Sequence, residues 1–200
     1  MPQNDELVFF SKWLQAPLSV ASVTPSGTHL ARAMVRALPP GDGLVVELGA
    51  GTGPITRALL DSGLDAGRLA VIERDAHFCA HLQRRFPDVR LVHGDALQLQ
   101  ALIRELASDM PVRAVISGLP LLTFSATLQY QLLEQTLALT QGLGPFIQFS
   151  YGLGSPLKSS VRASLGLSAQ CAAQVWRNVP PAKVWVYAAQ PGKVDGIADA

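Results

Sequence analysis

The chain has 200 residues, of which 48% are hydrophobic and 16% are charged, and its formal net charge at pH 7 is +1. This composition excludes disorder over most of the length, because apolar burial can offset the entropy of ordering the chain. A net charge so close to zero lacks the basic face of a duplex-binding protein and counts against a nucleic-acid partner. No apolar run reaches the roughly 18 residues of a membrane-spanning helix. The sequence therefore predicts one folded domain without a transmembrane segment.

The first predicted element is an amphipathic helix over residues 5–16. Acidic Asp5 and Glu6 stand where a signal peptide would carry basic residues, so we expect the protein to remain in the cytoplasm. Glu6 and Val8 interrupt an otherwise clear division into an apolar and a polar arc. Such a helix can attach reversibly to a membrane surface or pack on the protein's own core, and the sequence leaves both open. The apolar arc consists of Leu7, Phe9, Phe10, Trp13 and Leu14.

The middle of the chain alternates short β-branched runs with amphipathic runs. This rhythm predicts a parallel sheet covered by helices on both faces. The expected strands span 44–48, 68–72, 89–93, 112–117 and 145–150, and the expected helices span 55–61, 75–85, 96–106 and 124–143.

The end of the chain breaks this rhythm. Two strand-like segments, 170–179 and 183–189, are separated by a turn too short for a crossover helix, so we expect an antiparallel hairpin. The predicted fold is a Rossmann-like α/β class I methyltransferase, with a mostly parallel seven-stranded sheet that ends in this hairpin. We expect a single domain of this class over 1–190 and a flexible tail over 191–200.

A glycine-rich segment, Gly49-Ala50-Gly51-Thr52-Gly53, follows the first predicted strand of the sheet. Glycines let the backbone turn tightly here and approach a ligand, with the N–H groups of the next helix facing it. A dinucleotide-binding loop would read G-x-G-x-x-G, but Pro54 breaks that spacing and suits a first helical turn. Taken alone, a purely structural strand-to-helix turn remains an alternative.

Acidic residues end the next two strands. Glu73, followed by Arg74, lies about 20 residues beyond the glycines, where a carboxylate can accept both ribose hydroxyls of a nucleoside. Asp95, in Gly94-Asp95-Ala96, can accept from an adenine amino group, and both acids can alternatively cap helices. The lack of arginine near the glycine loop fits a cofactor without phosphates. We therefore expect S-adenosylmethionine, bound by Gly49, Ala50, Gly51, Gly53, Glu73, Arg74, Gly94, Asp95 and Ala96.

Glu47 stands on the first strand of the sheet, just before the glycines. Its charge can lie near the cationic methionine end of the cofactor, or its carboxylate can accept nearby backbone donors, and the sequence leaves both open. The four histidines show no metal-ligand spacing, so no metal is expected.

The fourth strand leads into Ser117-Gly118-Leu119-Pro120-Leu121-Leu122, at the position of an acceptor-binding loop. Nucleobase methylases place an Asn/Asp-Pro-Pro-aromatic motif here to stack a flipped base, whereas this loop is apolar. We expect Ser117 and Gly118 to adjoin the cofactor, and Leu119, Pro120 and Leu121 to contact the acceptor.

Several segments together resemble the small bacterial phosphatidylethanolamine N-methyltransferases, which convert that lipid stepwise to phosphatidylcholine. The resemblance extends over residues 7–189. It implies a single methyltransferase domain over 1–190, in which residues 5–36 form an N-terminal helical lid and membrane-contacting segment. Within this segment, Phe9, Phe10, Trp13 and Leu14 would bind the membrane surface, and Thr24 and Ser26 would close over the cofactor. It is based on Phe9-Phe10-Ser11-Lys12-Trp13, Ser22-Val23-Thr24-Pro25-Ser26, the glycine loop, Gly118-Leu119-Pro120-Leu121, Gln148-Phe149-Ser150-Tyr151-Gly152 and Pro180-Pro181-Ala182-Lys183-Val184-Trp185-Val186-Tyr187.

Methyl transfer to an amine needs a neutral nitrogen held close to the sulfonium, so positioning and desolvation can replace a strong base. Tyr151, at the end of the fifth strand, is the candidate catalytic residue that takes or relays the proton, and a core tyrosine is the alternative. Trp176 and Trp185 are expected to pack within the hairpin, with cation–π contact to a methylated headgroup as the alternative. Candidates for the lipid phosphate are Lys158, Arg162 and Arg177, each of which can instead be a solvated charge.

Two other functions stay open. An rRNA adenine dimethylase has a similar fold and glycine loop, but the missing base-stacking motif and the near-neutral charge count against it. A non-enzymatic membrane-surface domain with a relic cofactor fold is the second. The expected form is a peripheral monomer at the inner face of the bacterial membrane. The sequence does not determine the number of methyl groups transferred, or whether an ornithine lipid replaces the ethanolamine lipid.

Overall fold

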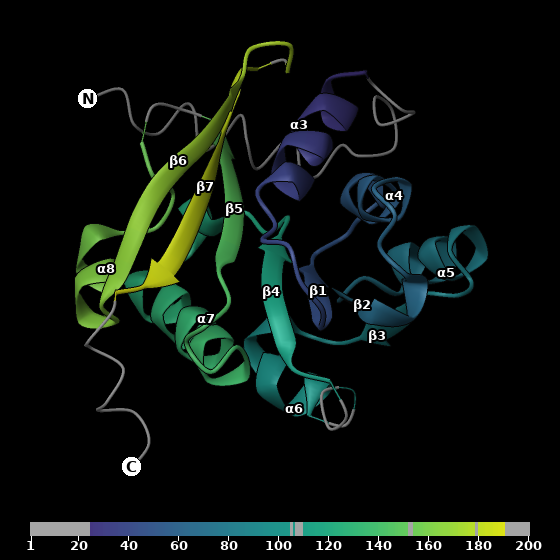
Figure 1. Cartoon of the computed structure of the whole chain (residues 1–200), viewed down its shortest axis with the longest axis horizontal. Helices are drawn as coiled ribbons and strands as arrows, with labels where there is room; N and C mark the ends of the chain where they lie inside the picture. Colours follow the sequence, from purple (N-terminus) through teal and green to yellow (C-terminus); the bar gives the residue numbers. More distant parts are fainter. Residues whose placement is uncertain (1–24, 105, 107–109, 152–153, 179, 191–200) are drawn as a thin grey trace.

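A seven-stranded sheet forms the centre of the computed structural model, which describes residues 25–104, 106, 110–151, 154–178 and 180–190 (Figure 1). The strand order is β3-β2-β1-β4-β5-β7-β6, with β1 to β5 parallel and with β7 antiparallel to both β5 and β6. The expected sheet and its C-terminal hairpin are therefore confirmed. The strands are β1 (Leu44–Leu48), β2 (Leu69–Glu73), β3 (Arg90–His93), β4 (Val112–Ser117), β5 (Phe146–Tyr151), β6 (Leu167–Val175) and β7 (Ala182–Ala189).

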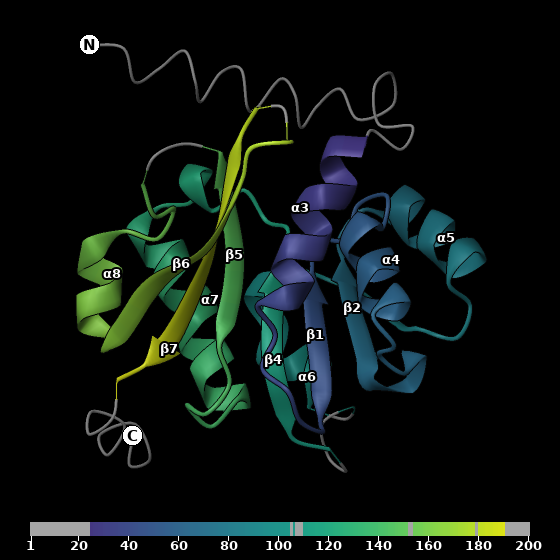
Figure 2. The ribbon, with the colours of Figure 1, turned by 45° about the horizontal axis from the view of Figure 1, so that its top comes forward.

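Helices cover both faces of the sheet, and each face has its own apolar cluster (Figure 2). One cluster receives α3 (Pro25–Arg36), α4 (Pro54–Asp61) and α5 (Ala76–Arg85); the other receives α6 (Leu99–Ile103), α7 (Ala126–Leu139) and α8 (Ser159–Ser164). Short 3₁₀ turns are η1 (Ala66–Arg68), η2 (Ala96–Gln98) and η3 (Leu121–Thr123).

Strand β1 shows why the sheet is so apolar. All five of its residues are buried, and alternate side chains point to opposite faces. Leu44, Val46 and Leu48 belong to the α6–α8 cluster, whereas Val45 belongs to the α3–α5 cluster. A central strand of a parallel sheet covered on both sides must be apolar on both sides. Glu47, which is fully buried in this strand, is therefore exceptional.

Two helices depart from the sequence prediction. The helix expected over 96–106 divides into η2 and α6, because the Asp95 side chain accepts from the Leu97 N–H and caps a 3₁₀ turn first. The helix expected over 124–143 is shorter, since α7 begins after its cap at Ser125 and ends at Leu139. No expected helix corresponded to α8, a six-residue polar segment that buries Val161. The proposed lid residues 5–24 and the tail 191–200 lie outside the described residues.

Candidate active site

Three parallel strands are each followed by a glycine at the carboxyl edge of the sheet. The Gly49 N–H donates to the Ile72 carbonyl over 2.8 Å, the Gly94 N–H to Glu73 over 3.0 Å, and the Gly118 N–H to Leu48 over 2.8 Å. The hydrogen-bond ladder thus continues one residue beyond the strands. It brings the glycine loop, the segment after β3 and the loop after β4 to one place, as the sequence predicted.

The glycine loop needs its glycines for both conformation and space. Gly49, Gly51 and Gly53 have φ values of +68°, +55° and +83°, in the left-handed region that side chains disfavour. Gly53 caps α4, and Pro54 follows at the first helical position, as expected. Ala50 is buried against the α3–α5 cluster.

Gly118 is the closest approach between the two loops. A Cβ built on it would lie 2.6 Å from the Gly49 carbonyl oxygen and 3.4 Å from that of Leu48. Both atoms belong to the main chain, so no side-chain rotation can relieve the contact. We expect Gly118→Ala to lower the free energy of unfolding by about 1–3 kcal/mol, as overpacking generally does. Urea denaturation measures this.

Gly154→Ala is the matched control for Gly118→Ala. It makes the same substitution where nothing lies within 4 Å of the added Cβ. Its unfolding free energy should stay within about 0.5 kcal/mol of the parent. Equal stability of the two variants would show that the β4 end can separate from the glycine loop without cost.

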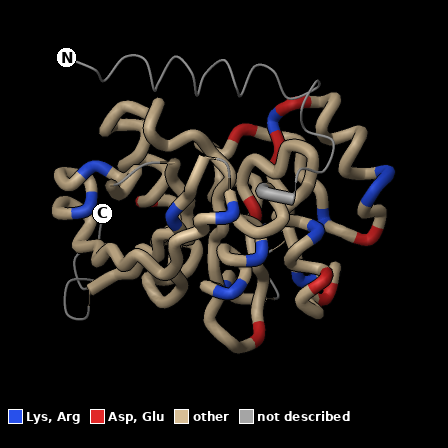
Figure 3. Tube along the Cα trace, turned by 90° about the horizontal axis from the view of Figure 1, so that it is seen from above, with Lys and Arg blue, Asp and Glu red and all other residues tan. Residues whose placement is uncertain are grey.

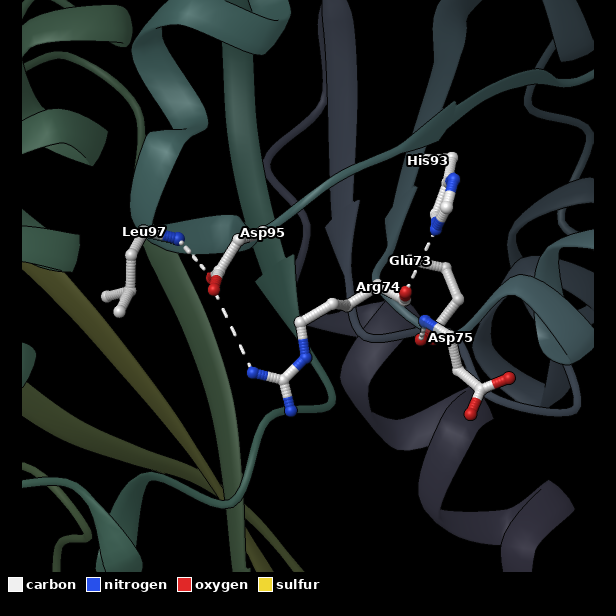
Figure 4. A network of polar contacts seen from close by, with 6 residues as sticks. All are labelled: Glu73, Arg74, Asp75, His93, Asp95 and Leu97. Atoms are coloured by element: carbon white, nitrogen blue, oxygen red, sulfur yellow. Dashed lines mark hydrogen bonds and ion pairs between the residues drawn. The ribbon is translucent and has the colours of Figure 1, made fainter.

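Glu73 links the glycine loop to the start of α5 (Figure 4). Its Oε2 accepts from the Gly51 N–H and its Oε1 accepts from the Asp75 N–H, both over 2.9 Å. Asp75, rather than Glu73, caps α5, with Oδ1 accepting from His77 and Phe78. A carboxylate has about four lone-pair sites, so two remain on Glu73 for a ligand.

Asp95 lies across the same edge of the site. Its Oδ1 accepts from the Leu97 N–H over 2.9 Å, so the capping role is present, and its Oδ2 lies 3.8 Å from the Arg74 guanidinium (Figure 4). The Arg74 side chain is 81% exposed, so this ion pair contributes little stability. His93 Nε2 donates to the Arg74 carbonyl over 3.0 Å and holds the segment after β2 against β3.

Glu47 is fully buried beneath the glycine loop. Its Oε2 accepts from Thr56 Oγ1 over 2.7 Å, and the Thr56 backbone also hydrogen-bonds it, so the backbone-accepting alternative is present. Its Oε1 is buried without a partner among the described residues. Burial raises the pKa of Glu47 to about 7, against the lowering effect of the Thr56 hydrogen bonds.

One sequence expectation about this loop is wrong. Arginine is not absent from its surroundings, because Arg85 of α5 donates from Nη1 to the Thr52 carbonyl over 2.8 Å. The Arg57 and Arg85 guanidinium carbons also lie 5.0 and 5.2 Å from the Phe86 ring centroid. The missed contact joins residues 33 positions apart, so it depends on the packing of α5. Both guanidinium groups are engaged with protein groups here.

The loop after β4 is held by side chains from its own end and from β5. Ser117 is fully buried, and its Oγ accepts from the Leu119 N–H over 3.2 Å. Gln148 of β5 donates from Nε2 to the carbonyls of Leu119 and Phe149, both over 3.0 Å, and its Oε1 is buried without a partner among the described residues. Gln148 belongs to a segment that carries the family resemblance, but the sequence did not predict its contact with Leu119, 29 residues away.

A shallow apolar groove lies between this loop and the end of β5. Residues 119–122 and 149–151, with Pro156, line it. The groove thus brings Leu119, Pro120 and Leu121 next to Tyr151, all of which were expected on the acceptor side.

Tyr151 is half-buried, and its hydroxyl hydrogen-bonds the side chain of Asn178. Burial raises the pKa of the phenol more than the Asn178 hydrogen bond lowers it, so the hydroxyl is neutral at physiological pH. Asn178 is itself buried, and its Nδ2 donates to the Pro180 carbonyl over 2.7 Å. Asn178 was not identified from the sequence.

The two tryptophans of the hairpin differ from each other. Trp185 is half-buried, donates from Nε1 to Ser150 Oγ over 3.1 Å and packs on the core, as expected. Trp176 is 74% exposed, so the expectation that it packs within the hairpin is wrong. The reason is that β6 ends at Val175, four residues before the predicted strand end, which leaves Trp176 in the turn.

The remaining predicted site residues are placed as follows. Ser26 lies in α3, and Ala96 is buried at the start of η2. Lys158 and Arg177 are exposed and Arg162 is half-buried. Among the described residues, no group of three or more His, Cys, Asp or Glu could hold a metal ion, and no helix is long and apolar enough to cross a membrane. Phe9, Phe10, Trp13, Leu14 and Thr24 lie outside the described residues.

Comparisons with known proteins place this geometry in context. No family model matches the sequence. The ornithine lipid N-methyltransferase of Singulisphaera acidiphila is 35% identical over 142 residues, which cover 68% of this chain and 73% of that protein. Ribosomal RNA small subunit methyltransferase A of Phenylobacterium zucineum is 40% identical over 96 residues, but these cover only 32% of its length.

A solved structure agrees in fold. Phosphoethanolamine N-methyltransferase 1 of Haemonchus contortus, in complex with phosphoethanolamine and S-adenosylhomocysteine, superposes with a TM-score of 0.59 at 16% identity, covering 96% of this chain and 51% of that one. Identity this low shows the fold alone. The extent of the match to the Singulisphaera enzyme, together with the confirmed fold, shows that the chain belongs to the ornithine lipid N-methyltransferase family of the class I S-adenosylmethionine-dependent methyltransferases.

Proposed function

We propose that the protein transfers a methyl group from S-adenosylmethionine to the amino group of a membrane lipid headgroup, at the inner face of the bacterial membrane. The observation that supports this most directly is the apolar groove beside the glycine loop, formed by residues 119–122 and 149–151. An apolar rim suits a lipid. The Singulisphaera relative, which is 35% identical over 142 residues, is itself a lipid N-methyltransferase.

The glycine loop and the strand-end acids would hold the cofactor. Glu73 keeps lone pairs for the ribose hydroxyls while it binds the Gly51 and Asp75 N–H groups. Asp95 keeps Oδ2 for the adenine amino group while Oδ1 caps η2. Capping and ligand binding are therefore compatible roles, and not alternatives. The unpartnered Oε1 of Glu47 is available to a positive group of the cofactor.

Transfer is an in-line displacement at the methyl carbon. The lipid ammonium first loses a proton to solvent, which a poorly hydrated groove favours by lowering the pKa of the amine. The nitrogen lone pair then forms the N–C bond as the C–S bond breaks, and the electron pair remains on sulfur. Tyr151 lines the groove with its hydroxyl held by the Asn178 side chain, so the phenol can hydrogen-bond the amine and orient its lone pair.

Tyr151→Phe tests this role. We expect kcat to fall about 10- to 100-fold, because the amine loses a group that orients its lone pair, with unchanged affinity for S-adenosylmethionine. Tyr130→Phe removes a phenol from α7, outside the groove, and should leave kcat unchanged. Full turnover by Tyr151→Phe with normal lipid binding would remove the phenol from the mechanism.

The headgroup is the finer part of the proposal. Phosphatidylethanolamine, converted stepwise toward phosphatidylcholine, follows from the sequence resemblance, whereas an ornithine lipid follows from the Singulisphaera relative. Both present a primary amine. Incubation with radiolabelled S-adenosylmethionine and separate vesicles containing each lipid, followed by chromatography of the products, distinguishes them and counts the methyl groups.

An rRNA adenine dimethylase function is the second candidate, because the Phenylobacterium relative, a ribosomal RNA small subunit methyltransferase, is 40% identical over 96 residues. The same assay therefore includes ribosomal RNA and small amines. Label in either lipid supports the proposal. Label only in RNA, or none despite measurable cofactor binding, would overturn it.

A further inference from the structure

The turn between β6 and β7 lies at the carboxyl edge of the sheet, next to the groove. Its first residue, Trp176, is 74% exposed. Among the described residues, the other exposed large hydrophobic side chains are Leu122, on the groove at 42%, and Leu143, at 88%. Leu143 precedes β5 and so lies at the opposite edge. Trp176, in the β6–β7 turn, and Leu122, on the groove, therefore both lie at the carboxyl edge.

Charge is divided unevenly between the two halves of the molecule. Residues 110–190 include five Lys or Arg residues but a single carboxylate, Glu134, which lies nine residues beyond the cap of α7. Seen from above, red segments gather on the side of α4 and α5, while the side of α8 and the hairpin shows mainly blue (Figure 3). Lys158, Arg177 and Lys183 adjoin the carboxyl edge on that side. This half complements an anionic surface, although the net charge of the chain is only +1.

A buried side chain of the same turn contacts the candidate catalytic residue, Tyr151. Two residues after Trp176, buried Asn178 hydrogen-bonds the Tyr151 hydroxyl and the Pro180 carbonyl. An exposed aromatic ring and a buried positioning amide thus belong to one short turn.

We propose that the β6–β7 turn is a membrane-docking element, in which Trp176 enters the interface of an anionic bilayer while Arg177 contacts lipid phosphates. Indole rings favour the boundary between hydrocarbon and water, because one edge is apolar and the N–H is polar. Docking in this way orients the groove toward the headgroups and fixes Asn178, which positions Tyr151. This inference rests on the proposed lipid substrate. It is separate from any membrane contact of residues 5–16.

Sedimentation with vesicles tests the docking. Trp176→Ala should bind vesicles of phosphatidylglycerol and phosphatidylcholine on the order of tenfold more weakly than the parent chain. Arg177→Gln should weaken binding about fivefold, and only to vesicles that contain the anionic lipid. Leu143→Ala removes a more exposed apolar side chain from the opposite edge and should change nothing. Unchanged thermal unfolding and unchanged affinity for S-adenosylmethionine show that each variant is folded.

A second measurement reports Trp176 directly. In a Trp13→Phe chain, Trp176 and half-buried Trp185 are the remaining tryptophans, so tryptophan fluorescence comes from these two side chains. Brominated lipid should quench part of this fluorescence, and a further Trp176→Phe change should abolish the quenching. Wild-type binding by Trp176→Ala, or quenching that persists without Trp176, overturns the docking while lipid methylation stands. If Trp176→Ala weakens binding to RNA and leaves vesicle binding unchanged, the turn is assigned to RNA. If the parent chain does not methylate lipid at all, the proposed function itself is removed.

Discussion

Replacing Glu73 by glutamine is expected to weaken binding of S-adenosylmethionine by about 100-fold. The two carboxylate oxygens accept from the Gly51 and Asp75 N–H groups, so any orientation of the amide directs its NH₂ at one of these donors. Two donors then face each other, which displaces the glycine loop from residue 73, and the ribose hydroxyls lose a charged acceptor. Hydrogen bonds to charged groups contribute about 1.5–3 kcal/mol each, and 3 kcal/mol corresponds to more than 100-fold in affinity. Isothermal titration calorimetry measures the dissociation constant of S-adenosylmethionine for the parent chain and the variant.

Asp75→Asn is the control for Glu73→Gln. It removes the same charge two residues away, and asparagine caps a helix about as well as aspartate does. The exposed Asp75 carboxylate accepts from the His77 and Phe78 N–H groups in the first turn of α5, so cofactor affinity should change by less than about threefold. Equal losses in the two variants would mean that net charge at this edge, and not the two-sided hydrogen bonding of Glu73, determines affinity.

The cofactor-free protein is expected to lose stability as the pH rises from 5 to 8, because of Glu47. Burial raises the pKa of this carboxyl from 4.5 to about 7. Between these values the folded chain holds a proton that the unfolded chain has released, so unfolding releases a proton and higher pH favours it. The stabilisation from the neutral form is complete below pH 4.5 and is lost as the pH rises through 7. A shift of this size corresponds to at most about 3 kcal/mol.

Glu47→Gln should remove this pH dependence. Its amide carbonyl can still accept from Thr56, and its uncharged NH₂ replaces the protonated oxygen. Urea denaturation at pH 5, 6, 7 and 8 should show that the free energy of unfolding of the parent chain falls relative to that of the variant as the pH rises. Glu134→Gln, an exposed change of the same charge, should leave the parent's slope intact. A slope that survives in Glu47→Gln would assign the proton to another group.

The sheet and the glycine loop could be predicted because their causes are local. Buried parallel strands are nearly continuous apolar runs, and Pro54 after Gly53 marks the start of a helix. Helix α8 could not be predicted, because this six-residue, mostly polar segment is held by the packing of Val161 and not by periodicity. The 3₁₀ turn at Ala96 was missed because the Asp95 side chain competes locally with the α-helix.

The cofactor side of the site was more predictable than the acceptor side. Glu73 ends β2 and Asp95 lies two residues beyond the neighbouring β3, so the topology alone brings them together. Gln148 and Asn178 act on residues 29 and 27 positions away, through contacts that only the packed hairpin and loop create. Trp176 was placed wrongly because strand propensity continued past Val175, where the chain in fact turns.

At the carboxyl edge on the cofactor side, the N–H groups of Gly49, Gly94 and Gly118 each donate to a carbonyl of a neighbouring strand, so main chain builds this part of the site. Substitutions elsewhere can alter it only by moving whole strands. The opposite wall consists of the side chains of residues 119–122 and 149–151, which can be exchanged one at a time. Because main chain builds the cofactor side and side chains build the acceptor side, substitutions can change which amine is preferred while the methyl donor stays the same.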